Sequence, residues 1–297
     1  SFRLVDGVGV YGGFAGTETA RDQRDPKLNL SILSGDLGDN DGPDFGGHGE
    51  NSYHVVLASS VGPGTVLDGF TITGGNTVGA ALPDFNGGGV FVLNGSVSLR
   101  NLTITRNKAA WGGGVYMTGS PESEMVNCRV FGNQATSVGG GLALAQSNPM
   151  LVNTTIAGNV AGNGGAVFSN AASPRFVNST IVANHASSLG GGIRLAGAGS
   201  SLMFDNCILW LNTSGAAQTA DQAAQVSIAG GGITLQFRHS LVQGWNGTLS
   251  GDATSGDDPL LVSLPNHGGD GWGTGGNDQF GDLRLTANSP AVDMGDS

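Results

Sequence analysis

The stretch Asn153-Thr154-Thr155-Ile156-Ala157-Gly158-Asn159 begins and ends on asparagine and has an apolar residue at its centre. The same seven-residue pattern occurs five times, and its first asparagines lie 25 to 28 residues apart. The asparagine pairs are Asn101/Asn107, Asn127/Asn133, Asn153/Asn159, Asn178/Asn184 and Asn206/Asn212. A fixed period in this range is typical of stacked repeats, because each unit leaves an open face that only its neighbour covers. The pattern therefore predicts an elongated solenoid.

Three short strands fit into each repeat. The first follows a run of glycines and alternates apolar, variable, apolar in most copies, as in Val115-Tyr116-Met117. The second precedes the first asparagine, and the third carries the central apolar residue, such as Ile156. This period of two is the signature of half-buried strands, and no amphipathic helical period competes with it. Three strands and three turns in about 26 residues predict one rung of a parallel β-helix, an all-β fold.

The repeat pattern weakens toward both ends of the chain. Residues 29–35 and 69–75 fit it upstream, and residues 235–239 fit it downstream. We therefore expect about eight rungs and a rod roughly 35–40 Å long, at about 4.8 Å per rung. The predicted β-helix covers residues 1–245, with loop insertions at 36–52 and 76–86, and residues 246–297 predict a loop-rich C-terminal cap on the same domain. Exposed rod ends would permit self-association.

The composition limits the partners of the chain. A net charge of −11 with only two lysines argues against nucleic acid, since phosphate binding needs a clustered basic surface. No stretch approaches the roughly 20 apolar residues of a transmembrane helix. The chain opens on Ser1 inside a strand-like run, which we interpret as a trimmed start. The surplus of aspartate is compatible with calcium or glycan binding, and solubility is the simpler alternative.

One family resemblance rests on the glycine run. Gly164-Gly165-Ala166-Val167, together with the Ile-x-x-Asn of the repeats, resembles the Gly-Gly-Ala-Ile and Phe-x-x-Asn repeats of chlamydial polymorphic outer membrane proteins. This chain has Ile, Val or Leu where those repeats have Phe. The resemblance implies a right-handed β-helix of a bacterial secreted or surface-anchored protein. It leaves the activity open, because such folds serve adhesins, lyases and hydrolases alike.

An acidic segment within the first insertion is a candidate calcium site. Its carboxylates are those of Asp36, Asp39, Asp41 and Asp44, and Gly42 lies among them. Calcium takes six to eight oxygen ligands from flexible, glycine-containing loops. The alternative is an acidic surface turn without metal.

The corner after the third strand is a candidate catalytic site. The two insertions leave successive rungs at this corner, and the next rung presents Arg106, Lys108 and Trp111 there. A lyase acting on an anionic glycan needs a base and a cation that neutralises the substrate carboxylate, roles that Lys108 and Arg106 could fill. The alternative is that both are ordinary surface charges. A glycoside hydrolase is less favoured, because the outward strand positions of the central repeats carry no acid pair.

The middle positions of the first strands predict an outward aromatic stripe. Phe91, Tyr116 and Phe168, with Trp111 nearby, could stack on sugar rings, and packing beneath a neighbouring segment is the alternative. Taken together, the sequence predicts an extracellular or cell-surface structural or adhesive protein that contacts a polysaccharide or cell-surface glycan. The alternative function is a polysaccharide lyase at the flank formed by the 36–52 and 76–86 loops.

Overall fold

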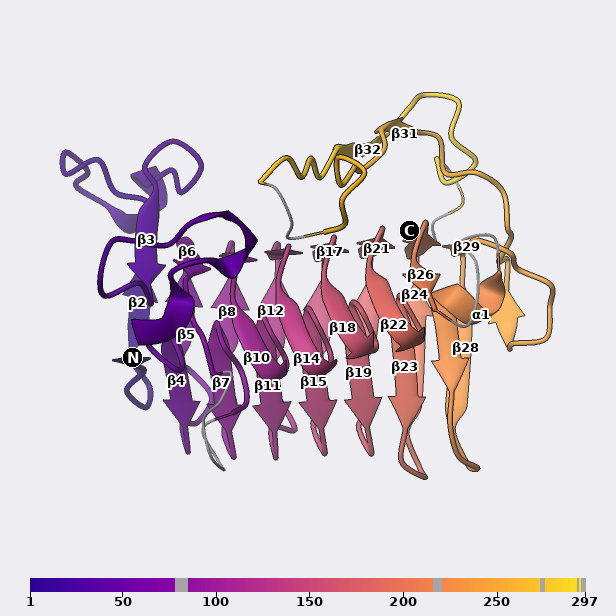
Figure 1. The fold of residues 1–297 in the computed structure, drawn as a ribbon, viewed down its shortest axis with the longest axis horizontal. Helices are drawn as coiled ribbons and strands as arrows, with labels where there is room; N and C mark the ends of the chain where they lie inside the picture. Colours follow the sequence, from indigo (N-terminus) through magenta and orange to yellow (C-terminus); the bar gives the residue numbers. More distant parts are fainter. Residues whose placement is uncertain (78–84, 216–220, 273–275, 293, 295–297) are drawn as a thin grey trace.

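The chain forms a rod of stacked rungs. The computed structural model describes residues 1–77, 85–215, 221–272, 276–292 and 294. Figure 1 shows that successive rungs follow one another along the rod from the N-terminal to the C-terminal end. The strands of the rod pair in parallel, as a β-helix requires, and one short helix, α1 (Gln222–Gln225), lies near its C-terminal end.

Three long parallel sheets form the walls of the rod. Sheet A contains β1 (Phe2–Arg3), β4 (Val56–Ser59), β7 (Val90–Leu93), β11 (Val115–Thr118), β15 (Leu142–Ala145), β19 (Val167–Asn170), β23 (Ile193–Ala196) and β27 (Val226–Ile228). Sheet B contains β2 (Gly9–Tyr11), β5 (Val66–Asp68), β8 (Ser98–Arg100), β12 (Glu124–Val126), β16 (Met150–Val152), β20 (Arg175–Val177), β24 (Ser201–Asp205), β28 (Thr234–Arg238) and β30 (Gly251–Asp252). Sheet C contains β3 (Ser31–Ser34), β6 (Phe70–Thr73), β9 (Thr103–Thr105), β13 (Arg129–Phe131), β17 (Thr155–Ala157), β21 (Thr180–Val182), β25 (Ile208–Trp210) and β29 (Leu241–Val242). Sheets of eight and nine strands confirm the predicted number of rungs.

A fourth sheet corrects the prediction of three strands per rung. Sheet D contains β10 (Lys108–Trp111), β14 (Gln134–Val138), β18 (Val160–Asn163), β22 (His185–Leu189) and β26 (Thr213–Ser214). These residues lie between the second asparagine and the glycine run, where the alternation of apolar side chains is weak. Irregular register in the pairs β10–β14, β14–β18 and β18–β22 explains why a pattern of period two does not reveal them.

The core consists of columns of like residues, one per rung. The central apolar residues of the repeats pair in register across sheet C, for example Val130 with Ile156, and they are fully buried. Sheet B contributes a stack of rings inside the rod: Phe176 and Phe204 lie 4.7 Å apart between centroids, and Phe204 and Phe237 lie 4.8 Å apart. Burial of such columns is the main stabilising contribution of a solenoid, because each rung supplies its neighbour with apolar contacts.

The two asparagines of each repeat lie in different places. The first asparagines have left-handed backbone, such as φ 48° at Asn153, and most of their side chains are exposed. The second asparagines are buried. The Asn159 amide donates to the carbonyl oxygens of Val130 (2.9 Å) and Ala157 (3.1 Å) and to Oδ1 of Asn184 (2.9 Å). The inner row therefore ties carbonyl oxygens of the sheet C strands of two neighbouring rungs together at the turn.

The glycine runs permit close packing of rungs at the turn between sheets D and A. At Gly140 a Cβ atom would collide with the carbonyl oxygens of Gly165 and Val160. Any larger residue there would force the rungs apart, which explains a glycine at this point of the repeat.

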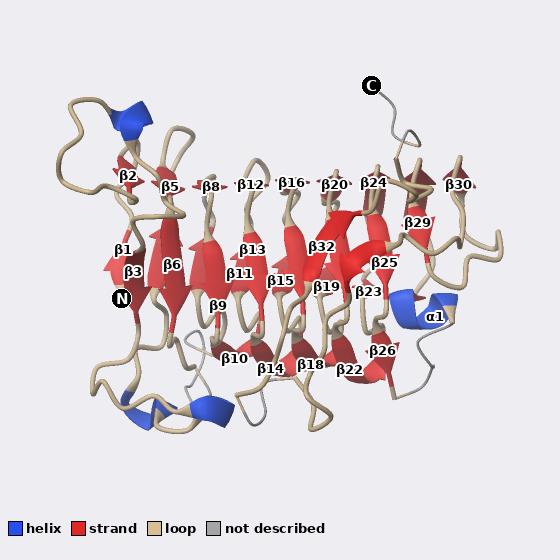
Figure 2. Ribbon diagram, turned by 90° about the horizontal axis from the view of Figure 1, so that it is seen from above, coloured by secondary structure: helices blue, strands red, loops and turns tan. Residues whose placement is uncertain are grey.

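The end of the chain runs back along the side of the rod. β30 extends sheet B beyond residue 245, and the following residues form an arm that contains the antiparallel pair β31 (Leu261–Ser263) and β32 (Asp282–Leu285). The arm crosses the outer face of sheet C (Figure 2). There it covers an apolar strip that includes Phe131, Val182 and Trp210. The predicted C-terminal cap, residues 246–297, thus adds a strand at the end of the rod and also covers one of its sides.

Candidate functional site

Two loops border the outer face of sheet C near the N-terminal end of the rod. Residues 15–30 lie at the margin that sheet C shares with sheet B, and residues 36–52 lie at the margin shared with sheet D (Figure 2). The C-terminal arm crosses the same face. Loops held on a rigid scaffold are the usual place for binding and catalysis, so this face is the candidate site.

The 36–52 loop is fastened to the second rung. The Asn51 amide donates to the Gly74 carbonyl oxygen at 2.6 Å, and the Asn76 amide donates to the His48 carbonyl oxygen at 2.7 Å. The amide of Ser52 also donates to the Gly35 carbonyl oxygen at 2.8 Å and so closes the base of the loop. The side chains of the loop are therefore held in fixed positions over the rung.

His48 is the buried titratable group of this loop. Its Nε2 lies 3.3 Å from Oδ2 of Asp41, and its ring meets that of Phe45 edge-on at 5.2 Å. Nδ1 is buried and has no hydrogen-bond partner in the part of the chain that the structure describes. Burial lowers the pKa of His48 below its ordinary value, and nearby Lys108 lowers it further, although Asp41 opposes both effects. In the tautomer with the proton on Nε2, His48 donates to Asp41, and its Nδ1 is an acceptor enclosed by the loop.

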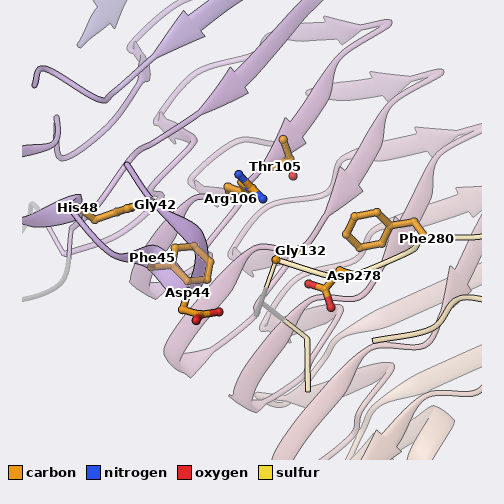
Figure 3. A pocket seen from close by; sticks show the side chains of 10 residues that line it. Gly42, Asp44, Phe45, His48, Thr105, Arg106, Gly132, Asp278 and Phe280 are labelled. Atoms are coloured by element: carbon orange, nitrogen blue, oxygen red, sulfur yellow. The ribbon is translucent and has the colours of Figure 1, made fainter. Parts of the chain in front are cut away.

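A small cavity of about 80 Å³ lies between the loop and the arm. Figure 3 shows Arg106 with Asp44 and Phe45 of the loop on one side and with Asp278 and Phe280 of the arm on the other. The other lining residues that the structure describes are Gly42, His48, Thr105, Gly132 and Gly276. The Arg106 side chain is exposed, and its guanidinium forms no hydrogen bond or ion pair with the residues that the structure describes. Residues from both ends of the chain thus build one cavity that contains a cation, Arg106, and two carboxylates, those of Asp44 and Asp278.

Three residues at this cavity have left-handed backbone. They are Asp44, Phe45 and Arg106, with φ of 59°, 56° and 54°. The position of Arg106 is left-handed in the following rungs as well, at Gly132, Gly158, Ala183 and Leu211. The conformation of Arg106 therefore belongs to the turn of the repeat, whereas that of Asp44 and Phe45 is particular to the 36–52 loop.

The structure brings Arg106 and Lys108 to the 36–52 loop, as the sequence analysis expects. Nζ of Lys108 lies 5.4 Å from the centroid of the Phe45 ring, a cation–π distance, and the Lys108 side chain is half-buried. Arg106 is therefore the more accessible of the two cations. Their catalytic role stays a prediction. Most of the predicted 76–86 loop, residues 78–84, lies outside the described residues.

The four aspartates of the candidate calcium site point to different partners. Asp36 accepts the backbone N–H groups of Gly38, Asn40 and Asp41 at 3.1 to 3.3 Å. Burial alone would raise the pKa of Asp36, but these N–H groups outweigh it and the pKa is lowered.

Asp41 binds His48 and the Asn51 amide, whereas Asp44 lines the cavity and Asp39 is exposed. Among the residues that the structure describes, no three His, Cys, Asp or Glu side chains form a group that could hold a metal ion. Calcium binding stays a prediction.

The predicted aromatic stripe is not exposed at the surface, contrary to what the sequence pattern indicates for Phe91 and Tyr116. Phe91 and Tyr116 are buried, 4 % and 6 % exposed, in a small cluster outside sheet A, whereas Trp111 and Phe168 are half-buried beside them. The reason is sheet D, which places Trp111 and Val138 against the outer side chains of sheet A. Phe91 and Tyr116 are therefore packing residues, the alternative considered for this stripe, and they offer no ring face to a sugar.

An open groove of about 1000 Å³ lies at the other margin of sheet C. It runs between the 21–30 segment and the first residues of β9, β13 and β17. Its charged lining residues are Arg21, Arg24, Lys27 and Arg129, with Asp22 and Asp25. Four cations against two carboxylates is an unusual balance in a chain of net charge −11.

Not every cation of the groove is available to a ligand. Arg24 pairs with Asp68 at 2.6 Å and donates to the Gly12 carbonyl oxygen, so it holds the loop in place. Arg21 lies over the Tyr11 ring, Arg129 lies over the Phe131 ring, and Lys27 is exposed. Three cations therefore face the groove without a carboxylate partner among the described residues.

The exposed asparagine row forms part of the groove floor. The Asn153 amide donates to Oδ1 of Asn127 at 2.7 Å, Asn127 donates to Asn101 at 3.3 Å, and Asn101 donates to Asp68 at 2.8 Å. Each amide keeps a further N–H group for a ligand. The row repeats about every 4.8 Å, the distance between rungs. A surface of this kind matches an extended polymer with hydroxyl and anionic groups.

Three features of the site are missed by sequence reasoning. The first is His48, a lone histidine in a glycine-rich loop. The second is the pair Phe280 and Asp278, which lie in an irregular tail more than 200 residues after the 36–52 loop. The third is the groove, which depends on a segment outside the repeat. The one local signal is the cluster of cations at residues 21–27, which the overall negative charge of the chain obscures.

The described part of the chain contains no helix with the length and hydrophobicity of a membrane span.

Comparison with known proteins agrees with this architecture. Residues 51–233, more than half of the chain, match the family described as right handed beta helix region. A crystal structure of pectate lyase Pel9A is similar in fold, with a TM-score of 0.47 and 13 % sequence identity over 88 % of this chain and 77 % of that one. Among curated proteins, none is similar enough in sequence to count as a relative.

Proposed function

The chain belongs to the right handed beta helix region family, and from this premise we propose that it is a secreted or surface-displayed protein that binds an anionic polysaccharide. The groove beside sheet C carries this proposal. It offers Arg21, Lys27 and Arg129 to a ligand along a row of asparagine amides, in a protein that is otherwise acidic. Basic side chains that have no carboxylate partner attract anionic ligands, even on a protein whose net charge is negative. The resemblance of the repeats to those of polymorphic outer membrane proteins supports a bacterial surface location.

The test measures binding to immobilised polygalacturonate and to a neutral glucan. We expect binding to the polyuronate and little to the glucan. The double variant Lys27→Gln with Arg129→Gln should bind at least about tenfold more weakly, since each charge-assisted contact contributes about 1 kcal/mol or more. Arg3→Gln is the matched control, because Arg3 is exposed on β1 and lines neither the groove nor the cavity. Equal losses in the control and the double variant would contradict the assignment of the groove.

A polysaccharide lyase is the second candidate function. It is favoured by the cavity, where Arg106 lies with His48 beside the 36–52 loop and forms no ion pair within the described ranges. Arg106 would neutralise a substrate carboxylate, and Lys108 would take the proton from the carbon atom next to it. The electron pair of that C–H bond would form a C=C bond as the glycosidic C–O bond breaks and the leaving sugar takes up a proton. Release of an unsaturated product from a polyuronate, followed by ultraviolet absorbance, would support this function. A lowered melting temperature in the presence of a chelator would support the predicted calcium in the same loop.

A further inference from the structure

The exposed asparagine row of the groove leads back along the rod to Gly69, in the second rung. Gly69 lies between β5 and β6, as Asn101 lies between β8 and β9, and its backbone is left-handed as well, with φ of 85°. Its N–H group donates to the carbonyl oxygen of Arg100, just as that of Asn101 donates to Val126 in the next rung. Gly69 therefore occupies the row position of its rung.

The 15–30 loop crosses the row at this glycine, beside β5 (Figure 2). A Cβ atom on Gly69 would lie 2.6 Å from Nη1 of Arg24 and 3.0 Å from Cγ of Pro26. Arg24 is held there by its ion pair with Asp68, in which the two side chains are 12 % and 9 % exposed. The crossing is therefore a packed wall across the row, and the absence of a side chain at Gly69 makes room for it.

On the C-terminal side of this wall the row stays exposed through four rungs. The exposed side chains are those of Asn101, Asn127, Asn153 and Asn178, whereas that of Asn206 is half-buried. The residue two positions after each exposed asparagine begins a strand of sheet C on its outer face, and these residues are Thr103, Arg129, Thr155 and Thr180. The row therefore offers four equivalent positions, about 4.8 Å apart.

The positive charge of the groove is concentrated at the wall. Arg21 and Lys27 belong to the loop that forms the wall, and Arg129 lies two rungs beyond it. Asp22 and Asp25 line this end as well. The Asp25 carboxylate accepts the backbone N–H groups of Lys27 and of the following residue, so it is engaged within its own turn. A uronate unit at the wall would thus lie among three cations.

A groove that is closed at one end suits the end of a polymer. An internal stretch of a polysaccharide leaves its binding site in both directions, and an extended chain over Asn101 would run into Arg24 and Pro26. A chain end can stop at the wall while the rest of the chain follows the row toward Asn178.

We propose that the groove recognises the end of an anionic polysaccharide chain, with the terminal unit against the 15–30 loop and about four units along the asparagine row. This inference rests on the proposed function, because it specifies which part of the same polymer the groove binds. It makes the loop the element that selects chain ends.

The first experiment compares polygalacturonate chains of two lengths, about 20 and about 200 units, by calorimetric titration at equal mass of uronate. Binding to ends depends on the number of chains, so we expect the short chains to bind with about tenfold higher apparent affinity per unit mass. Binding to internal stretches depends on the mass of uronate instead. Equal affinity per unit mass, or a higher affinity for the long chains, would overturn the inference.

The second experiment locates the chain end with oligogalacturonates. The affinity should rise with length up to about four units and then stay constant. Thr103→Asp, next to the wall, adds a carboxylate that should weaken binding of both the trimer and the hexamer at least about fivefold. Thr180→Asp is the matched variant, at the same position of a rung three rungs further along. It should weaken the hexamer at least about threefold and leave the trimer within about twofold of the unmodified protein.

The outcomes separate this inference from the proposed function. Equal losses of trimer binding in the two variants would contradict a chain end at the wall, as would affinity that keeps rising well beyond four units. In either case binding to the polyuronate, and with it the proposed function, would stand. Failure of every galacturonate chain to bind would reject the proposed function and this inference together.

Discussion

Asparagine has two distinct roles in each of the five central repeats, and the backbone separates them. The first asparagine occupies a left-handed turn and forms an exposed row, whereas the second lies inside the turn and satisfies carbonyl groups of its own rung and of the preceding one. The exposed row is open to ligands, and the buried row belongs to the scaffold. One residue type thus serves stability and binding at positions six residues apart.

The buried row supports a prediction about a single residue. Asn159→Asp should destabilise the protein by about 3 kcal/mol or more, because a buried carboxylate loses three donated hydrogen bonds and faces three oxygen atoms. Asn153→Asp is the matched control. It changes the same atoms on the exposed row, where one bond to Asn127 is lost and water replaces it, so the cost should stay below about 1 kcal/mol. Chemical denaturation of both variants measures the difference, and similar losses would show that the two rows are equally accessible.

At the scale of elements, the C-terminal arm is fixed to the rod by aromatic stacking. The Phe280 ring lies 4.9 Å from that of Phe131 on β13 and 5.5 Å from that of Trp272 in the arm, between centroids. These contacts bring Asp278 to the cavity. The arm therefore matters to the site as well as to the apolar strip that it covers.

Phe280→Ala should release the arm and leave the rod folded. The pair with Phe131 joins the arm to the rod, and its loss costs about 0.5–1.5 kcal/mol, enough to raise the open population of the arm about two- to tenfold. Limited proteolysis should then cut the arm faster, with little change in the melting of the rod. Leu264→Ala is a suitable control, since Leu264 is 51 % exposed on the same arm. An arm equally resistant in both variants would mean that other contacts hold it.

At the scale of the whole molecule, stability is the sum of contributions from rungs and their interfaces. A rung in the middle has two neighbours, whereas the first rung has one. Ile156 on β17 is fully buried between two rungs, and Leu33 on β3 is half-buried at the N-terminal end.

Ile156→Ala should therefore destabilise the rod by about 2–5 kcal/mol, as for a cavity in a packed core. Leu33→Ala should cost roughly half as much, because part of the side chain is already in water. Amide hydrogen exchange should show faster exchange throughout the central rungs in the first variant, and only near β3 in the second. Uniform acceleration along the rod in both variants would contradict the additive description of the rungs.

The sequence by itself determines the repeat and therefore the fold. Period, alternation and the central apolar residue of each copy specify the sheets and the core, because these are local patterns repeated in register. The resemblance adds the right-handed β-helix, which the family match confirms. The sequence also places Arg106 and Lys108 beside the 36–52 loop, since all three follow the same corner of successive rungs.

The tertiary structure alone decides what lies outside the repeat. It shows that Phe91 and Tyr116 are buried, because an unpredicted fourth sheet turns side chains against them. It also brings Phe280 and Asp278 to Arg106, across a separation in sequence that no local pattern describes. The sequence repeat identifies the residues that occupy equivalent positions in successive rungs. Contacts between a loop and a distant arm depend instead on the path that the chain takes after the last rung. The fold could therefore be read from the heptapeptides, and the cavity and the groove required the folded chain.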